Sequence, residues 1–200
     1  MTISDRIRVQ NVRLLSDDHY TLKTPTFEWR RASGEWQTQH RETYDRGDGA
    51  TLLPYNLAQR SVVLIRQFRY PAYVNGCDDL LIETVAGLLD NEAPEIRIRA
   101  EVEEEPGYRL GDIQKVFEAF MSPGAVTEKL HFFVAEYQPN MRIGSGGGLA
   151  SEGEDIEVLE LPFDQALAMI GDGRIADAKT IVLLQYAALN IFRQGTTTGS

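Results

Sequence analysis

The chain contains a single cysteine, Cys77, and this scarcity already limits what the protein can be. One thiol excludes an internal disulfide framework and a cysteine-rich zinc site, so we interpret Cys77 as incidental. Long apolar runs are missing as well. No stretch approaches the 18 residues of a membrane-spanning helix, and the first ten residues, MTISDRIRVQ, lack the apolar segment of a signal peptide. We therefore expect a cytoplasmic protein with no membrane partner.

Basic residues are also scarce. The 20 Lys and Arg residues face 30 Asp and Glu residues, which gives a net charge of −10. Nucleic acids and anionic membrane surfaces are bound through basic patches, so neither is expected as a partner. A protein this acidic can bind a phosphate-bearing ligand only if a metal ion and a few placed arginines or lysines offset the repulsion. The length and the 42% of hydrophobic residues fit one globular domain with a small extra subdomain.

Alternating polar and apolar residues near the N-terminus predict three antiparallel strands, at 7–15, 20–30 and 36–45. Such a small sheet is marginal by itself, so we expect it to pack on the rest of the chain or on a second subunit. A turn at 46–49 is the expected border between this N-terminal β subdomain (1–45) and a main domain (46–194). Residues 195–200 are predicted to form a flexible tail.

The main domain alternates strands with a few helices. Strands are predicted at 50–57, 61–68, 80–86, 113–120, 130–137 and 156–161, helices at 162–171 and 177–193, and loops at 71–79 and 140–155. This order favours the α/β class, with a mixed sheet between helices in an α/β/α sandwich. The loop at 140–155 is long enough to be functional, and a plain flexible connector is the alternative.

The stretch 87–108, GLLDNEAPEIRIRAEVEEEPGY, predicts a glycine turn, one short helix and a Pro-Gly exit. Asp90 or Asn91 is expected to cap the helix and Pro94 to occupy its first turn.

Three carboxylates of this helix, Glu101, Glu104 and Glu105, fall on one face, while Glu103 points elsewhere. Because stacked like charges repel, we expect a divalent cation with oxygen ligands in front of them. The alternative is an ordinary solvated acidic face, which most glutamate runs form.

This spacing resembles the Nudix box, G-x5-E-x7-R-E-U-x-E-E-x-G-U, in which U is apolar. The matching residues are Gly87, Glu92, Glu101, Val102, Glu104, Glu105, Gly107 and Tyr108. Two departures are visible: only four residues separate Gly87 from Glu92, and Ala100 stands at the arginine position. Arg97, four residues before Glu101, is a candidate substitute, and Arg97→Ala should then weaken metal binding.

The resemblance extends from about residue 12 to 190 and is closest to the branch of Nudix hydrolases that cleaves GDP-mannose. It implies the Nudix fold, Mg²⁺ or alternatively Mn²⁺ as cofactor, and hydrolysis of GDP-mannose to GMP and mannose 1-phosphate. It also implies a homodimer through the N-terminal sheet, in which the partner completes each site. The segments MSPGAVTE and EDIEVLELPF resemble ADP-ribose pyrophosphatases too, so an ADP-ribose or ADP-sugar pyrophosphatase is an alternative. A non-catalytic nucleotide-binding module is a third interpretation.

The resemblance also implies site residues. Metal ligands would be the carbonyl of Ala86 and the carboxylates of Glu101, Glu105 and Glu154, with Glu104 in support. The catalytic carboxylates would be Glu105, Glu154 and Glu128, with the general base either Glu154, on a closing loop, or Glu128. Substrate contacts would come from His19, His40, Arg41, Glu42, Arg69, Gly87, Leu88, Glu128, Gly153 and Lys179. Without the resemblance, the histidines and Arg69 would be interpreted as surface residues. His19 replaces the tyrosine of that branch, and Gly153 replaces an acidic residue.

Overall fold

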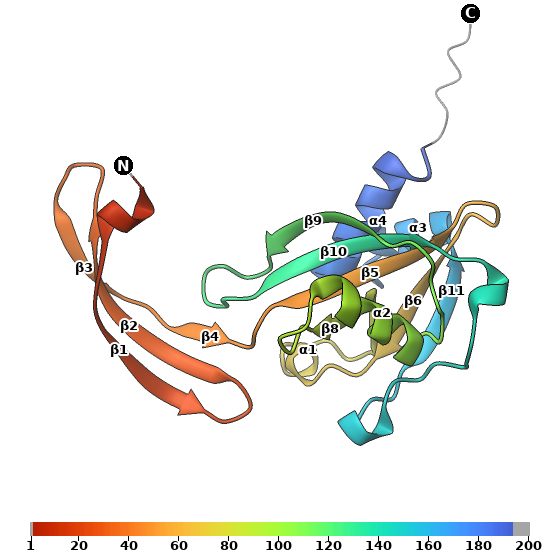
Figure 1. The fold of residues 1–200 in the computed structure, drawn as a ribbon, viewed down its shortest axis with the longest axis horizontal. Helices are drawn as coiled ribbons and strands as arrows, with labels where there is room; N and C mark the ends of the chain where they lie inside the picture. Colours follow the sequence, from red (N-terminus) through yellow and green to blue (C-terminus); the bar gives the residue numbers. More distant parts are fainter. Residues whose placement is uncertain (1, 194–200) are drawn as a thin grey trace, which may run out of the picture. The chain divides into compact units, whose positions relative to one another are not determined.

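The structure, a computed structural model, describes residues 2–193, apart from the side chain of residue 152. The chain forms two compact units (Figure 1). The N-terminal unit contains the residues up to Asp48 together with Phe120–Lys129, and the main unit contains Gly49–Ala119 and the residues from Leu130 onwards. The predicted tail at 195–200 lies outside the described residues. The predicted domain border at 45/46 stays a prediction, and the sequence did not reveal that 120–129 joins the N-terminal unit.

The N-terminal unit is built on an antiparallel sheet, as predicted. A short 3-10 helix, η1 (Ile3–Arg6), leads into β1 (Ile7–Asp17), which pairs with β2 (Thr21–Arg30); β2 also pairs with β3 (Trp36–His40) and β4 (Thr43–Asp45). The predicted strand 36–45 is therefore split in two. At the split, Arg41 lies beside Pro25, whose carbonyl accepts a 3.4 Å hydrogen bond but which has no N–H to return.

This unit has no hydrophobic core: none of its described residues is buried. Two tryptophans are instead covered by guanidinium groups, that of Arg6 at 4.4 Å from the ring centre of Trp29 and that of Arg8 at 3.8 Å from Trp36. The segment 120–129 is attached through the backbone of Tyr44, which donates to Ala125 and accepts from Thr127.

The main unit contains a seven-stranded mixed sheet with the order β11-β6-β5-β10-β9, in which β7 also pairs with β6 and β8 with β5. The central pair, β5 and β10, is parallel. The strands are β5 (Gly49–Asn56), β6 (Ser61–Gln67), β7 (Leu81–Glu83), β8 (Val85–Leu88), β9 (Gln114–Phe120), β10 (Lys129–Glu136) and β11 (Glu157–Pro162).

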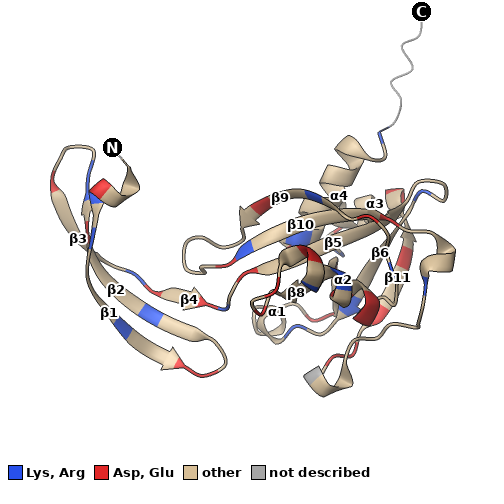
Figure 2. Cartoon of the chain, in the orientation of Figure 1, with Lys and Arg blue, Asp and Glu red and all other residues tan. Residues whose placement is uncertain are grey.

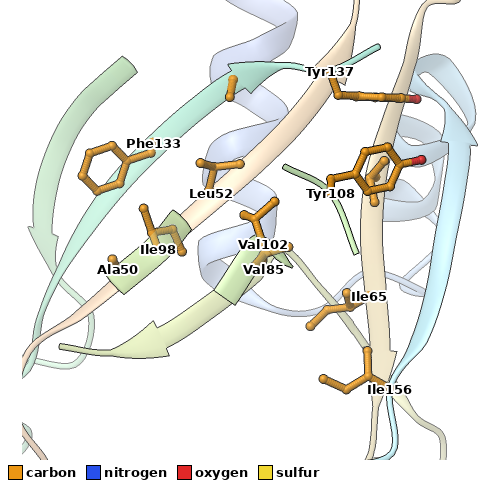
Figure 3. Close-up of a cluster of buried hydrophobic side chains, with 12 residues drawn as sticks. Ala50, Leu52, Ile65, Val85, Ile98, Val102, Tyr108, Phe133, Tyr137 and Ile156 are labelled. Carbon is orange, nitrogen blue, oxygen red and sulfur yellow. The ribbon is translucent and has the colours of Figure 1, made fainter. Parts of the chain in front are cut away.

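Helices cover both faces of this sheet (Figure 1). The helices are α1 (Tyr70–Val74), α2 (Pro94–Glu104), α3 (Phe163–Gly171) and α4 (Ala178–Asn190), with short 3-10 helices η2 (Pro139–Met141) and η3 (Ala150–Glu152). On one face, Ile98 and Val102 of α2 pack into a cluster of buried strand residues that includes Leu52 and Val85 (Figure 3). On the other face α4 buries Leu183, Leu184 and Ala187, and α3 packs beside it. The arrangement confirms the predicted α/β/α sandwich. None of the described helices has the length and apolar character needed to cross a membrane.

Two local predictions for the main unit were wrong. The predicted loop at 71–79 begins with the short helix α1, in which Pro71 sits in the first turn where its missing N–H is harmless. The predicted strand 80–86 is broken at Thr84, whose N–H donates to the Thr180 hydroxyl of α4 at 2.7 Å instead of to a neighbouring strand. At this break the chain leaves β6 and pairs with β5, which brings residues 85–88 against α2.

Candidate active site

The backbone of β8 lies directly against two carboxylates of α2. A Cβ atom at Gly87 would be 1.7 Å from Oε1 of Glu101, so this position can only be glycine while Glu101 keeps its place. One residue earlier, the N–H of Ala86 donates to Oε2 of Glu105 at 3.3 Å. Ala86, a predicted metal ligand, and Gly87, a predicted substrate contact, therefore lie beside Glu101 and Glu105, with Leu88 at the end of the strand. The predicted glycine turn at 87 was wrong, because Gly87 pairs with Ala50 inside β8.

The turn that leads into α2 differs from the prediction. Asp90 and Asn91 both have positive φ, 45° and 71°, and Ala93 is the residue that precedes the helix, without a side-chain cap. Two consecutive left-handed residues reverse the chain within the shortened loop, which leaves neither side chain at the cap position. Pro94 occupies the start of the helix as predicted.

The carboxylates of Glu101 and Glu105 are both buried, with 4% and 1% of each residue exposed. Burial raises the pKa of Glu101 to about 7; Arg97 opposes this, while Glu104 and Glu154 add to it. Burial also raises the pKa of Glu105 well above its ordinary value, and the charges of Glu101 and Glu154 raise it further. The structure therefore brings these groups close enough to repel each other. Figure 2 shows acidic positions gathered at the C-terminal end of α2.

Arg97 lies where the sequence suggested a substitute for the missing box arginine. Its Nη2 is 2.5 Å from Oε1 of Glu101, and the two form an i, i+4 pair on α2. Its Nε is buried and has no hydrogen-bond partner within the described part of the chain. Glu103 points away from the cluster, as predicted, and its carboxylate accepts two 2.9 Å hydrogen bonds from Arg109.

The glycine-rich loop, predicted at 140–155, is hydrogen-bonded to the end of α2, which a plain flexible connector would not be. The N–H of Gly147 donates to the carbonyl of Glu105 at 2.9 Å, and that of Gly148 to the carbonyl of Glu104 at 3.2 Å. A Cβ atom at Gly146 would be 2.2 Å from the Glu105 carbonyl oxygen, so the approach requires glycine.

The remainder of the loop carries Glu154. Its Oε2 accepts a 2.8 Å hydrogen bond from the N–H of Leu149, within the loop itself. Gly153 is exposed and left-handed, with φ of 75°, at the end of η3. The loop thus holds the predicted third carboxylate near α2, where its charge raises the pKa of both buried glutamates.

These donors suit a divalent cation in chemistry and charge. All are hard oxygen ligands, and two are buried carboxylates whose ionised form a nearby cation would stabilise. As they stand, no group of three or more His, Cys, Asp or Glu side chains in residues 2–193 is arranged to hold an ion. The hydrogen bonds explain this, because Glu101 is turned towards Arg97 and Glu154 towards the amide of Leu149.

A second charged cluster joins two predicted substrate residues. Glu83, at the end of β7, accepts hydrogen bonds from Nε and Nη2 of Arg69 at 2.8 and 3.2 Å, and from Nζ of Lys179 at 2.5 Å. Lys179 is also 3.1 Å from Asp177, which caps α4 through the N–H of Thr180. Sequence reasoning missed Glu83. The available signal was a carboxylate inside the apolar segment LLIETVA, because a buried acid needs a cationic partner.

The other predicted substrate residues belong to the N-terminal unit. The His40 ring is 3.0 Å from the Thr26 hydroxyl, the His19 ring packs on Tyr20, and Glu128 lies 3.7 Å from Arg46. A pocket of about 630 Å³ lies within this unit, with Phe27, Arg41, Glu42, Phe120 and Val126 among its lining residues. Two of the predicted contacts, Arg41 and Glu42, therefore share one concave surface.

Known proteins are similar to this chain both in its N-terminal sheet and over nearly its whole length. The family model of the GDP-mannose pyrophosphatase NudK N-terminal domain matches residues 6–44. The GDP-mannose pyrophosphatase of Pectobacterium atrosepticum is 54% identical over 188 residues, covering 94% of this chain and 96% of that protein. Those of Shigella flexneri serotype 5b and Escherichia coli O157:H7 are each 52% identical over 189 residues, covering 94% of this chain and 98% of theirs.

The full-length similarity, the sandwich and the carboxylate helix packed against β8 agree with one another. Together they show that the chain belongs to the Nudix hydrolases, enzymes that act on pyrophosphate bonds and generally use divalent metal ions.

Proposed function

We propose that the protein hydrolyses GDP-mannose to GMP and mannose 1-phosphate in a reaction that depends on Mg²⁺, with Mn²⁺ as an alternative. The observation that carries the proposal is the pair of buried carboxylates, Glu101 and Glu105, packed against residues 86 and 87 of β8. The substrate is supported by the relatives above, which are named for this activity and align over 94% of the chain.

In this proposal Glu101, Glu105 and Glu154, with the carbonyl of Ala86, hold the ion, and Glu104 supports them. Bound there, a divalent cation supplies positive charge against the pyrophosphate oxygens and makes water a better nucleophile at neutral pH. The backbone of Gly87 and Leu88 is proposed to contact the pyrophosphate beside these carboxylates.

The chain's cations act on the phosphates. Arg69 and Lys179 bind the phosphate oxygens, where negative charge shifts as the bridging bond breaks. Water adds to one phosphorus, the bridging P–O bond breaks, and mannose 1-phosphate leaves with the bridging oxygen if the attack is on the GMP phosphorus. We assign the proton acceptor to Glu154 within the main unit. The alternative from the sequence, Glu128, is paired with Arg46 in the N-terminal unit.

His19, His40, Arg41 and Glu42 are proposed to contact the nucleotide or sugar, as the resemblance implies. Gly153 is proposed separately as a substrate contact of the glycine-rich loop. We also propose a homodimer through the N-terminal sheet. A sheet whose described residues include none that is buried gains stability by covering its apolar side chains, such as Val9, Val12 and Leu14, which are 60%, 52% and 53% exposed. The cytoplasmic location and the exclusion of nucleic acid as a partner stay predictions from the sequence.

The test is incubation of the purified protein with Mg²⁺ and, separately, GDP-mannose, ADP-ribose and an ADP-sugar, with chromatography of the products. GMP from GDP-mannose as the preferred reaction is the expected result. Preferred release of AMP would instead establish the ADP-ribose or ADP-sugar alternative, and no product from any substrate would favour a binding module. Glu105→Gln should abolish turnover, and undiminished turnover would remove Glu105 from the metal site.

A further inference from the structure

Glu83 is a buried carboxylate that the reaction as described above does not use. It belongs to β7, with 1% of the residue exposed, and its side chain bridges Arg69 and Lys179, which are 110 positions apart in the chain. The guanidinium of Arg69 donates to both carboxylate oxygens, and the Lys179 ammonium donates to one of them. One acidic group therefore fixes two cations from different elements.

The charges of this cluster keep Glu83 ionised. Burial by itself would raise its pKa, but the nearby Lys179 and Arg69 outweigh burial and hold the pKa below the usual value. The carboxylate is thus a permanent acceptor at neutral pH. Its two cationic partners cannot both leave it without exposing a buried negative charge, which is strongly unfavourable.

The cluster also reaches the carboxylates of α2. Burial lowers the pKa of the Arg69 guanidinium, but the hydrogen bond and charge of Glu83 outweigh it and raise the pKa, and the charge of Glu105 raises it further. Arg69 is therefore bonded to Glu83 and near enough to Glu105 to be influenced by its charge. Its side chain remains 42% exposed, so the guanidinium is held in place and still accessible to a ligand.

A second layer fixes the lysine. Asp177 lies 3.1 Å from Nζ of Lys179 and also caps α4, accepting from the N–H and the hydroxyl of Thr180. Thr180 in turn accepts from the N–H of Thr84, the residue directly after Glu83. The flexible lysine side chain is therefore restrained from its own helix and from the strand junction, so less conformational freedom is left to lose when a ligand binds.

We infer that Glu83 is a positioning residue that holds Arg69 and Lys179 ready for the phosphates of the substrate, without touching the substrate itself. The inference rests on the proposed function, in which those two cations bind the pyrophosphate. It assigns the buried acid a role in the reaction, through the two side chains that it orients.

The experiment compares Glu83→Gln with Asp164→Asn. The control removes the charge of another carboxylate that binds an arginine through two hydrogen bonds, at 2.9 and 2.8 Å from Arg60, but on the surface of α3. Binding of inorganic pyrophosphate is measured by calorimetry, kcat and KM for GDP-mannose by product analysis, and folding by thermal unfolding. Glu83→Gln should weaken pyrophosphate binding and lower kcat/KM at least tenfold, whereas Asp164→Asn should change neither by more than twofold.

The same substitution in a variant that lacks both cations separates positioning from a structural role. In a background with Arg69→Met and Lys179→Met, Glu83→Gln should change pyrophosphate binding and kcat/KM by less than twofold, because the side chains through which it acts are gone. This background leaves the buried Glu83 charge unpaired, so its folding is first measured by thermal unfolding. If it does not fold, the comparison of Glu83→Asp with wild type replaces it. An equal loss in both backgrounds, or unchanged pyrophosphate binding in folded Glu83→Gln, would overturn the inference. If Glu83→Gln does not fold, Glu83→Asp replaces it: the charge remains but the reach is shorter, and wild-type pyrophosphate binding would overturn the inference. If wild-type protein binds pyrophosphate but releases no GMP, the proposed function is refuted, while the inference that Glu83 positions Arg69 and Lys179 is not.

Discussion

Gly87→Ala tests whether the position of Glu101 governs turnover. The new methyl group would lie 1.7, 2.3 and 2.7 Å from Oε1, Cδ and Cγ of Glu101, so the carboxylate must retreat by more than about 1 Å to reach an ordinary contact. Glu101 is buried and paired with Arg97, so the retreat disrupts that pair or displaces α2. Overpacking of this kind costs about 1–3 kcal/mol in stability. A misplacement of about 1 Å at a reacting site costs about 100-fold in rate.

The assay therefore looks for a large loss of activity in a protein that still folds. We expect Gly87→Ala to lose about 100-fold in kcat/KM for GDP-mannose and to need a higher Mg²⁺ concentration, while urea unfolding shows a loss of about 3 kcal/mol or less. The matched control is Gly111→Ala, because a Cβ atom there meets nothing within 4 Å. Wild-type kcat/KM in folded Gly87→Ala would refute the argument that this glycine keeps Glu101 in its working position.

Mg²⁺ affinity should fall at least about tenfold from pH 8 to pH 6, because the pKa of Glu101 is about 7 and protons compete with the ion below it; a flat calorimetric profile would contradict the ligand assignment. Arg97→Ala removes a charge that lowers this pKa, so the same profile should move to higher pH, with about tenfold weaker Mg²⁺ binding at pH 7. Unchanged affinity would remove Arg97 from the site. Asp177→Ala removes the cap on α4, where the carboxylate accepts from the N–H and hydroxyl of Thr180, and should cost about 1–2 kcal/mol in urea unfolding. Stability equal to wild type would show that the cap is dispensable.

Local signals in the sequence were sufficient for most of the main elements. Pro94 and the Pro106-Gly107 exit marked the two ends of α2, because proline favours a helix start and cannot continue a helix, although the predicted cap lay two to three residues too early. Alternation of polar and apolar residues located the strands of the N-terminal sheet in the same way. Even α1 carried such a signal in Pro71, but a helix of five residues has no apolar periodicity to support it.

The features that the sequence did not reveal depend on partners far away in the chain. The break at Thr84 exists because its N–H finds the hydroxyl of Thr180, 96 positions later. The role of Glu83 likewise depends on Lys179, on another helix. The two wrong cap assignments, Asp90 and Asn91, have a nearer cause, since both residues lie in left-handed backbone in the loop before α2. Residue types alone indicate that a buried acid needs a partner, and only the fold identifies which one.

The hydrogen bonds that attach the glycine-rich loop to α2 limit how far the Glu154 side chain can move. The N–H of Ile156 donates to the carbonyl of Gly147 at 3.2 Å, and the amides of Gly147 and Gly148 hold the end of α2. If the loop closes over the substrate as the resemblance implies, residues 149–155 are the part that can move, because residues 147, 148 and 156 are held by these hydrogen bonds. In such a closure the Glu154 carboxylate can move only a short distance, and it must first lose its hydrogen bond from the N–H of Leu149. A larger movement that also broke the hydrogen bonds of Gly147 and Gly148 would leave the last carbonyls of α2 without these partners. Such a movement would therefore destabilise the end of the helix that carries Glu101 and Glu105.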